Sequence, residues 1–232
     1  MTWATLRLCA IHLAANALLL WLGYEWLGVG ESTGLRLVMS ALDALAILGL
    51  VCWLYGATFV YFRSTERRLN EAFRTALRHI VPLLLAAICI IAVYGLLVWL
   101  AGAAVQPAFK TASYLTLKLQ KPVRPSAVLA GLRALIWILR WIILPVAVLP
   151  MLGAIATRGW RGFGEIGWRA GWRYWLAVPA LLLAGLMLPA LILAWIPRGS
   201  FAIELASFSL RALVAYLLMV GSLVALTRVA RP

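Results

Sequence analysis

The strongest constraint on this chain is a series of six long apolar segments joined by short, arginine-bearing connections. A helix needs about 20 predominantly apolar residues to cross the hydrocarbon core of a membrane. The segments that meet or approach this length are Leu8–Val29, Leu37–Phe62, Val81–Val105, Ala134–Thr157, Trp175–Ile196 and Leu210–Thr227. Backbone groups cannot stay unpaired in lipid, and the alternating pattern of barrel strands is absent. The sequence therefore predicts an all-α integral membrane protein, a bundle of six transmembrane helices in one domain, residues 1–232.

The composition excludes the soluble classes of protein. Of the 232 residues, 65% are hydrophobic and 12% are charged, whereas a typical globular chain is about half apolar and about a quarter charged. This excludes a cytosolic enzyme, a disordered tail and a secreted disulfide scaffold. Few basic residues and no clear cleavage site accompany Leu8–Val29, so we expect it to be a span rather than a signal peptide.

The chain is strongly basic, with a formal net charge of +14, and all its cations except Lys110, Lys118 and Lys121 are arginines. They are scattered between the apolar segments, beside tryptophans, rather than gathered on one hydrophilic face. This pattern favours contact with anionic lipid headgroups over nucleic acid, and the arginine fork suits phosphate oxygens. We expect membrane lipids as partners and no nucleic acid, with a membrane-protein partner or a homo-oligomer left open.

The orientation of the spans is predicted from the basic residues in the connections, since these are enriched on the cytoplasmic side. With a cytoplasmic N-terminus, the inner set is Arg7, Arg63, Arg67, Arg68, Arg74, Arg78, Arg158, Arg161, Arg169, Arg173, Arg228 and Arg231. The smaller outer set is Arg36, Lys110, Lys118, Lys121, Arg124, Arg133, Arg198 and Arg211. We expect both termini in the cytoplasm, although the Lys110–Arg133 segment opposes this. The compact, arginine-flanked spans favour a bacterial cytoplasmic membrane.

The spans form three hairpins (about 8–62, 81–157 and 175–227) that show signs of internal repetition. The pattern aromatic-Arg-x-x-x-Arg begins at Phe73 and again at Trp168, and a proline follows each, Pro82 and Pro179. Duplicated hairpins are one explanation, with 8–62 as a degenerate copy and the segment from Gln106 to Pro125 as an insertion. The alternative is that all spans flanked by arginine and tryptophan look alike.

Two segments are candidates for amphipathic helices at the membrane surface. Ser64–His79 places apolar residues at helical spacing, which predicts a helix in the headgroup plane with its apolar face in lipid. Arg158–Trp175 alternates tryptophan with arginine, but its glycines disfavour a continuous helix and predict a loop in its first part. Anchoring of the hairpins is the favoured role, and binding of headgroups or a cytoplasmic partner is the alternative. The headgroup candidates are Arg74, Arg78, Trp168, Arg169, Trp172 and Arg173.

A proline-bearing span, a Gly-rich turn and the motif Gly167-Trp168-Arg169-x-x-Trp172-Arg173-Tyr174-Trp175 precede a leucine-rich span. This arrangement, over roughly Leu149–Leu188, resembles the helical membrane domains associated with bacterial glycerophosphodiester phosphodiesterases and their multi-span relatives. The chain has no phosphodiesterase catalytic domain. The resemblance therefore implies only a membrane bundle of the kind that such proteins use as an anchor or accessory module.

Ionisable residues inside a bilayer cost roughly 2.5–3.5 kcal/mol on insertion scales and so mark candidate sites. Asp43 and Arg140 lie at similar depth in their predicted spans, and an ion pair between them would offset both costs. The alternatives are that Arg140 reaches the interface and that Asp43 is neutral or capped by Ser40. Asn16 is expected to hydrogen-bond between helices, and Glu25 to face water.

The chain lacks the residue patterns of known membrane enzymes. His12 and His79 are the only histidines, and Cys9, Cys52 and Cys89 have no ligand spacing. Haem ligation by the two histidines is a disfavoured alternative, so we expect no cofactor and no metal. Metalloprotease, hydrolase and nucleotide-binding motifs are absent, as is an intramembrane carboxylate pair.

The sequence thus predicts a non-enzymatic membrane protein that acts as a scaffold, an accessory subunit or a lipid-headgroup-binding module. A small-solute transporter or permease is the alternative. Proline-broken helices, here at Pro145, Pro150, Pro179 and Pro189, are a feature of transport folds. The polar residues available for a pathway are few.

Overall fold

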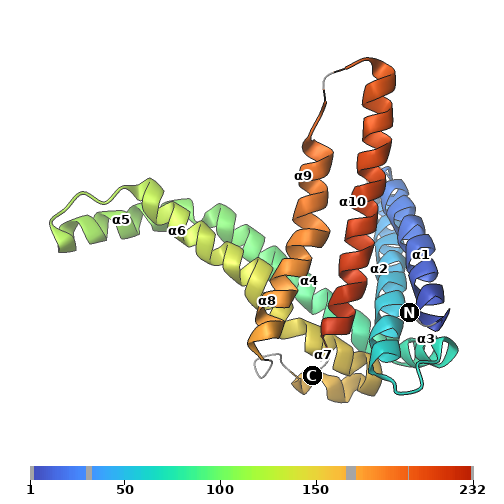
Figure 1. Cartoon of the computed structure of the whole chain (residues 1–232). Coiled ribbons are helices and arrows are strands. Elements are labelled where there is room, and N and C mark those ends of the chain that lie inside the picture. The colour runs from blue at the N-terminus through green and yellow to red at the C-terminus, as the bar shows by residue number, and fades with distance from the viewer. Residues whose placement is uncertain (1–2, 30–32, 166–170, 198, 231–232) are drawn as a thin grey trace.

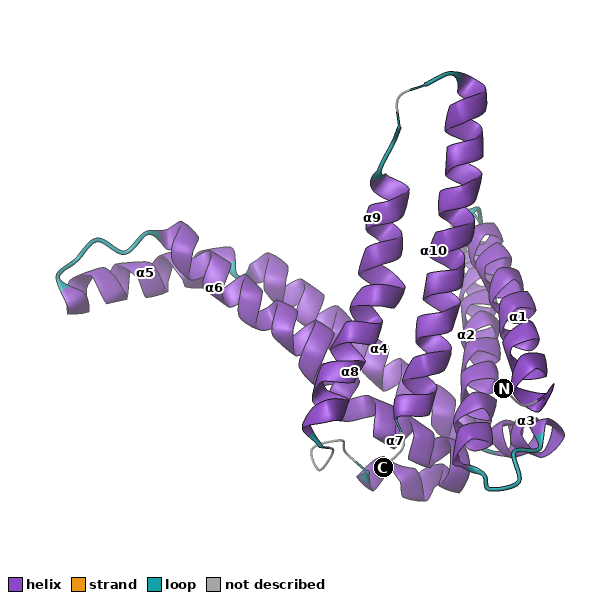
Figure 2. Ribbon diagram, in the orientation of Figure 1, coloured by secondary structure: helices purple, strands orange, loops and turns teal. Residues whose placement is uncertain are grey.

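The computed structural model describes residues 3–29, 33–165, 171–197 and 199–230, and all regular structure in these ranges is helical (Figure 2). The α-helices are α1 (Trp3–Leu27), α2 (Gly34–Arg63), α3 (Leu69–Arg78), α4 (Ile80–Ala103), α5 (Val105–Leu119), α6 (Pro125–Ile138), α7 (Leu144–Arg158), α8 (Trp172–Leu182), α9 (Leu188–Ala194) and α10 (Phe201–Val229). Two π turns, η1 (Leu139–Ile143) and η4 (Leu183–Met187), and a 3₁₀ helix, η2 (Gly159–Gly164), complete them.

Six helical segments in the described ranges are long and apolar enough to cross a membrane. They are Thr5–Leu27, Gly34–Arg63, Ile80–Ala103, Pro125–Gly164, Trp172–Ala194 and Phe201–Val229. Each overlaps one of the segments expected from the apolar pattern. The chain is therefore a multi-pass, all-α membrane protein, and the predicted fold class is confirmed.

The fourth and fifth spans each contain a π turn just before a proline. In η1 the N–H of Leu144 donates to the C=O of Leu139, five residues back, and η4 repeats this pattern. Pro145 and Pro189 follow the two turns. Proline has no N–H and crowds the preceding turn, so a wider turn lets the helix continue through it. Residues 125–158 therefore form one continuous helical segment rather than a re-entrant piece.

The two π turns also bear on the predicted duplication of hairpins. One lies in the second span of the 81–157 hairpin, and the other lies in the first span of the 175–227 hairpin. The two hairpins therefore differ at this point, and their duplication stays a prediction.

The second hairpin leans away from the rest of the molecule (Figure 1). The expected insertion after Gln106 is mostly the helix α5, which continues α4 outward before α6 returns. We call residues 87–143 the arm. The helical segment 125–158 is about 50 Å long at about 1.5 Å per residue, which exceeds the hydrocarbon core of about 30 Å. Such a helix fits a membrane when it is strongly tilted, as the arm is relative to the upright hairpins.

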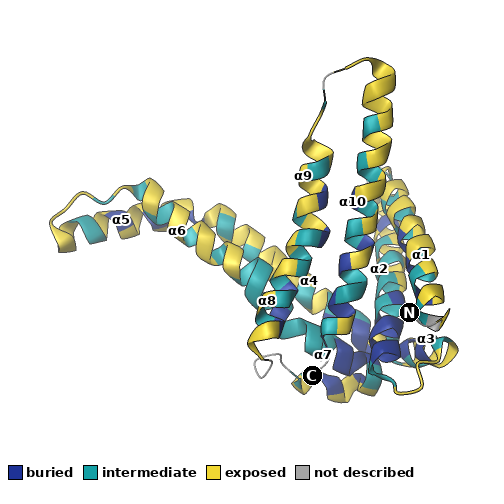
Figure 3. Cartoon of the chain, viewed as in Figure 1, coloured by how far each residue is buried: buried dark blue, intermediate teal, exposed yellow. Residues whose placement is uncertain are grey.

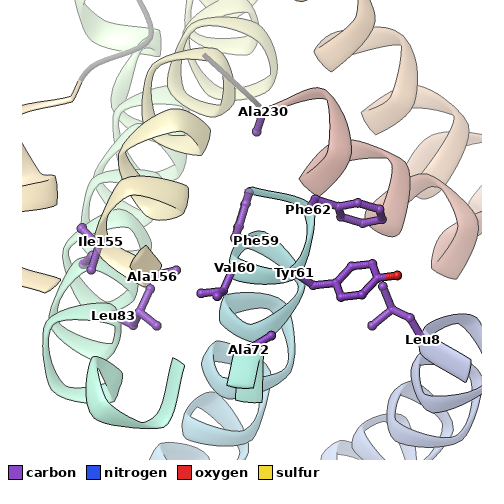
Figure 4. Close-up of a cluster of buried hydrophobic side chains, with 11 residues drawn as sticks. Leu8, Phe59, Val60, Tyr61, Phe62, Ala72, Leu83, Ile155, Ala156 and Ala230 are labelled. Atoms are coloured by element: carbon purple, nitrogen blue, oxygen red, sulfur yellow. The ribbon is translucent and has the colours of Figure 1, made fainter. Parts of the chain in front are cut away.

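In contrast to the arm, one end of the molecule is closely packed, and we call it the basal end. There α1, α4 and α8 begin, α2, α7 and α10 end, and α3 and η2 lie beside them (Figure 1). Burial concentrates at this end, while the arm and the outer halves of the hairpins stay exposed (Figure 3). Five helices, together with Ala230 directly after α10, contribute to one apolar cluster of Leu8, Phe59, Val60, Tyr61, Phe62, Ala72, Leu83, Ala86, Ile155, Ala156 and Ala230 (Figure 4).

Two glycines permit close approaches at the basal end. A Cβ atom on Gly162 would lie 2.3 Å from the backbone nitrogen of Ile155, so η2 folds directly onto the backbone of α7. Gly159 has a φ of +62° and packs against the ring of His79. Both positions exclude a side chain, the first through space and the second through backbone conformation as well.

Polar contacts add to this packing. The Nη2 of Arg63 donates to the C=O of Pro150 at 3.2 Å and of Ala230 at 3.0 Å, which ties α2 to α7 and to the end of α10. The hydroxyl of Tyr174 donates to the C=O of Val146 at 2.9 Å. This is the carbonyl that Pro150, four residues on, has no N–H to satisfy. The proline-containing helix is thus stabilised from a neighbouring span.

The amphipathic helix α3 differs from its prediction in what covers its apolar face. Ala72 and Ala76 are buried at the basal end, and the Nε1 of Trp53 on α2 donates to the C=O of Phe73 at 3.0 Å. The Trp53 and Phe73 rings lie 5.5 Å apart, edge to face. Protein rather than lipid covers much of this face, because the small residues Gly56 of α2 and Ala76 let the two helices pack closely.

The second interfacial candidate is described only in part. A loop was expected for its first part, but the structure has the 3₁₀ helix η2 there. This helix tolerates the glycines because they allow its tight contact with α7. Residues 166–170, including Trp168 and Arg169, lie outside the described residues.

Candidate functional site

Four of the predicted headgroup residues lie exposed at the basal end. Arg74 and Arg78 are exposed on α3. Trp172 begins α8 with 70% of its surface exposed, and the Arg173 guanidinium lies 5.7 Å from its ring centroid. We call these four residues the basal collar. It combines cations with an amphipathic aromatic ring, the pair of residue types that suits a membrane–water boundary.

The structure adds a pocket that the sequence analysis did not predict, between the start of α1 and the start of α3. This basal pocket has a volume of about 490 Å³, and its lining residues are Trp3, Arg7, Arg67, Arg68, Leu69, Asn70 and Glu71. The Arg7 guanidinium lies 5.2 Å from the Trp3 ring centroid. Arg7 is remote in sequence from the α3 residues, so only the fold brings them together.

The charges in the basal pocket are unevenly compensated. Arg68 pairs with Glu66 at 3.0 Å and with Glu71 at 3.2 Å. Arg158 pairs with Glu165, and no ion pair within the described residues includes Arg7 or Arg67. Arg7 and Arg67 therefore remain as cations without a carboxylate partner within the described residues.

The N-terminus of α3 also faces this pocket. Its cap residue Arg68 makes no side-chain cap hydrogen bond, and the three residues that follow it line the pocket. The first N–H groups of a helix have no partner within the helix and carry the positive end of its dipole. They reinforce the positive character that Arg7 and Arg67 supply.

A buried polar network joins α1 to α2. The hydroxyl of Thr58 donates to the C=O of Leu54 at 2.8 Å, so its oxygen accepts from the Nε2 of His12 at 2.7 Å. The Nδ2 of Asn16 donates to the C=O of His12 at 2.8 Å and lies 3.4 Å from its Nδ1. The hydroxyl of Tyr55 donates to the Oδ1 of Asn16 at 2.8 Å. Asn16 hydrogen-bonds between helices, as predicted.

The two histidines therefore lie in separate settings. His12 has a protein neighbour at each ring nitrogen, whereas His79 donates from Nδ1 to the C=O of Ala156 at 3.0 Å. His79 is half-buried, which differs from the solvated position expected for it. Cys9, Cys52 and Cys89 are free thiols, and no group of three potential metal ligands occurs among the described residues.

The predicted ion pair between Asp43 and Arg140 is wrong. The guanidinium of Arg140 lies on the arm, 5.0 Å from the ring centroid of Tyr94 and 5.3 Å from that of Trp141. Asp43 lies on α2 and has no ion-pair partner among the described residues. The lean of the arm separates the two residues, and cation–π contacts take the place of the carboxylate. Sequence depth alone carries no information about this lean.

Asp43 instead shares a pocket of about 310 Å³ with Glu25, which we call the acidic pocket. Both residues are exposed, so the expectation that Glu25 faces outward holds. No hydrogen bond joins Ser40 to Asp43; the hydroxyl and the C=O of Ser40 accept from the Nε1 of Trp26 at 3.0 and 2.9 Å. The α1–α2 hairpin therefore has two carboxylates on the lining of one pocket.

Comparisons with known proteins add no relative to this picture: no family model, no curated protein and no solved structure matches the chain. Its function is therefore argued from the geometry of its own residues.

Proposed function

We propose that this protein is a non-enzymatic membrane module whose basal end binds anionic lipid headgroups. In this role it serves as a scaffold or accessory subunit in a bacterial cytoplasmic membrane. The observation that carries the proposal is the basal collar. Its arginines and tryptophan are exposed at the one end of the molecule where the helices are packed.

The chemistry of the collar supports this role. Each juxtamembrane cation contributes roughly 1 kcal/mol of attraction to an anionic membrane surface. Guanidinium groups bind phosphate oxygens bidentately, and they stay protonated at all ordinary pH values, so they are poor proton-transfer groups. A rigid support beneath them favours binding, because the side chains then lose less freedom when they engage a headgroup.

The proposed orientation places the basal end in the cytoplasm. Trp3 and Ala230, the first and last described residues, both lie toward the basal end (Figure 1). The larger set of basic residues lies in the connections of this end, which the positive-inside rule assigns to the cytoplasm. A role as an anchor or accessory module agrees with the resemblance to the membrane domains associated with glycerophosphodiester phosphodiesterases.

The test is to measure the lipids that the purified full-length chain retains. We expect phosphatidylglycerol and cardiolipin to be enriched over phosphatidylethanolamine relative to the host membrane, as quantified by mass spectrometry. The triple variant R74A/R78A/R173A should lose much of this enrichment. Val93→Ala, an exposed apolar change on the arm, is the control and should leave it unchanged. Wild-type protein without any preference for anionic lipid would refute the proposal.

A small-solute transporter is the second candidate, favoured by one observation. Glu25 and Asp43 both line the acidic pocket, and the His12–Asn16 network lies on the same hairpin. Carboxylates within membrane helices are a common feature of ion and proton pathways. Uptake into energised vesicles that is abolished by Asp43→Asn would favour transport. Uptake that this change leaves untouched would remove Asp43 from any pathway.

A further inference from the structure

We infer that the basal pocket is a binding site for one phosphate-bearing lipid headgroup, held by Arg7 and Arg67. This inference rests on the proposed function, since it assumes an anionic lipid as the ligand. It goes beyond that function because it assigns a discrete site with one occupant. It also relies on residues outside the basal collar.

The position of the pocket fits a headgroup. The first span begins at Thr5 and the second ends at Arg63. The pocket residues Trp3, Arg7 and Arg67 lie beside these two boundaries. The phosphate layer of a membrane lies just outside the hydrocarbon core that the spans cross. Trp3, with 68% of its surface exposed, has the amphipathic ring that favours this layer.

The charge pattern of the pocket fits a single phosphate. Arg68 is engaged by Glu66 and Glu71, so it holds the start of α3 in place instead of offering a free charge. Arg7 and Arg67 lack a carboxylate partner among the described residues, and both are exposed. Two guanidinium groups match the oxygens of one phosphodiester, and the uncapped start of α3 adds to the positive potential.

Arg67 has a backbone conformation that residues with a side chain rarely adopt. Its φ is +49°, in the left-handed region that glycine adopts most readily. A glycine would suit the turn between α2 and α3 better, yet the chain has a cation here. The guanidinium, rather than the backbone, is therefore the property that we assign to this position.

The decisive experiment compares two double variants that remove the same charge. The full-length protein in detergent is titrated with short-chain phosphatidylglycerol, and bound lipid is counted by native mass spectrometry. R7A/R67A should weaken the tightest binding event by about tenfold or more, as expected for lost charge-assisted hydrogen bonds. R124A/R133A, which removes two exposed arginines of the arm, should change it by less than about twofold.

A third variant separates binding from folding. Arg67→Gly removes the cation and relieves the left-handed backbone, so it should fold at least as well as wild type. It should nevertheless bind phosphatidylglycerol several-fold more weakly. Thermal unfolding measured on the same samples gives the folding control. If Arg67→Gly binds lipid as tightly as wild type, the assignment of Arg67 is overturned.

Inorganic phosphate distinguishes a lipid headgroup from a free anion, because the two share the recognised group. Binding of inorganic phosphate that is much weaker than that of the lipid supports a headgroup site. Tight binding of inorganic phosphate without lipid binding would overturn it.

The remaining outcomes separate the pocket from the proposed function. Equal losses in R7A/R67A and R124A/R133A would refute a discrete pocket while leaving the collar function intact. Wild-type protein that binds no phosphatidylglycerol at all would refute both.

Discussion

The basal end and the arm are built from similarly apolar helices, but they are stabilised in different ways. At the basal end, five helices and Ala230 converge on one cluster, and Arg63 and Tyr174 bond to carbonyl groups of α7. Along the arm, Leu96, Trp99 and Phe109 are exposed. The arm is held chiefly by contacts between its own outgoing and returning helices. One of these is the cation–π contact between the Arg140 guanidinium and the Tyr94 ring.

This difference illustrates how helices associate in lipid. Lipid tails are as apolar as leucine, so burying leucine against another helix gains little from the hydrophobic effect. Close packing at small residues and hydrogen bonds between helices decide where spans associate. The basal end has both, through Gly162, Ala76 and Arg63. We therefore expect substitutions to have large effects there and small effects on the arm.

The largest effect is expected for Gly162→Ala. The added Cβ would lie 2.3 Å from the Ile155 nitrogen, so η2 must detach from α7, at a cost of about 3 kcal/mol or more. Unfolding in SDS followed by circular dichroism measures this cost. Gly164→Ala is the matched control, because a Cβ there meets no atom within 4 Å. Equal stability of the two variants would contradict the tight contact between η2 and α7.

The next effect is expected for Arg63→Met, which keeps much of the side-chain volume but removes the donors to Pro150 and Ala230. Two carbonyl contacts are lost between α2, α7 and α10, which should lower stability by about 2 kcal/mol. The same unfolding assay applies, with Arg161→Met, an exposed arginine of η2, as control. A loss no greater than that of the control would show that Arg63 does not tie these helices together.

A smaller effect is expected for Asn16→Leu in the α1–α2 network. The variant loses the hydrogen bonds to Tyr55 and His12, and interhelical hydrogen bonds in membranes contribute about 0.6 to 1.7 kcal/mol. Ser209→Ala is the control, since the Ser209 hydroxyl bonds only to Leu205 in its own helix. A stability equal to that of wild type would mean that the network does not hold α1 against α2.

The smallest effect is expected on the arm. Leu117, with 80% of its surface exposed, should tolerate alanine with a change within about 0.5 kcal/mol. Thermal unfolding in lipid nanodiscs is the appropriate measurement. A large loss would contradict the comparison, because it would show that another molecule covers the arm.

Much of the fold was predictable because apolar length and backbone satisfaction are local requirements. The six spans, the helix at Leu69–Arg78 and the interhelical role of Asn16 all follow from patterns within single segments. The candidate site was predictable only in part. Arg74 and Arg78 belong to one amphipathic helix, and its periodicity marks them, whereas the basal pocket needs Arg7 from a helix far away in sequence.

The failures have a common physical cause. The Asp43–Arg140 pair was inferred from depth along two spans, but depth does not state the angle at which a span lies. That Glu25 and Asp43 line one pocket likewise depends on how α1 faces α2. Both depend on how two helices are placed relative to each other, which the pattern of a single segment does not record.

Helical crossing of a membrane follows from the amino-acid pattern of this chain alone, because unpaired backbone groups are too costly in lipid and no barrel pattern is present. The same pattern shows which connections carry the arginines. The lean of one hairpin as the arm, and the place of Arg7 and Arg67 on one pocket at the start of α3, arise from the packing of the helices in three dimensions. In lipid, the preference of one helix for another rests on a few close contacts and hydrogen bonds, and the apolar pattern of a single segment does not encode them.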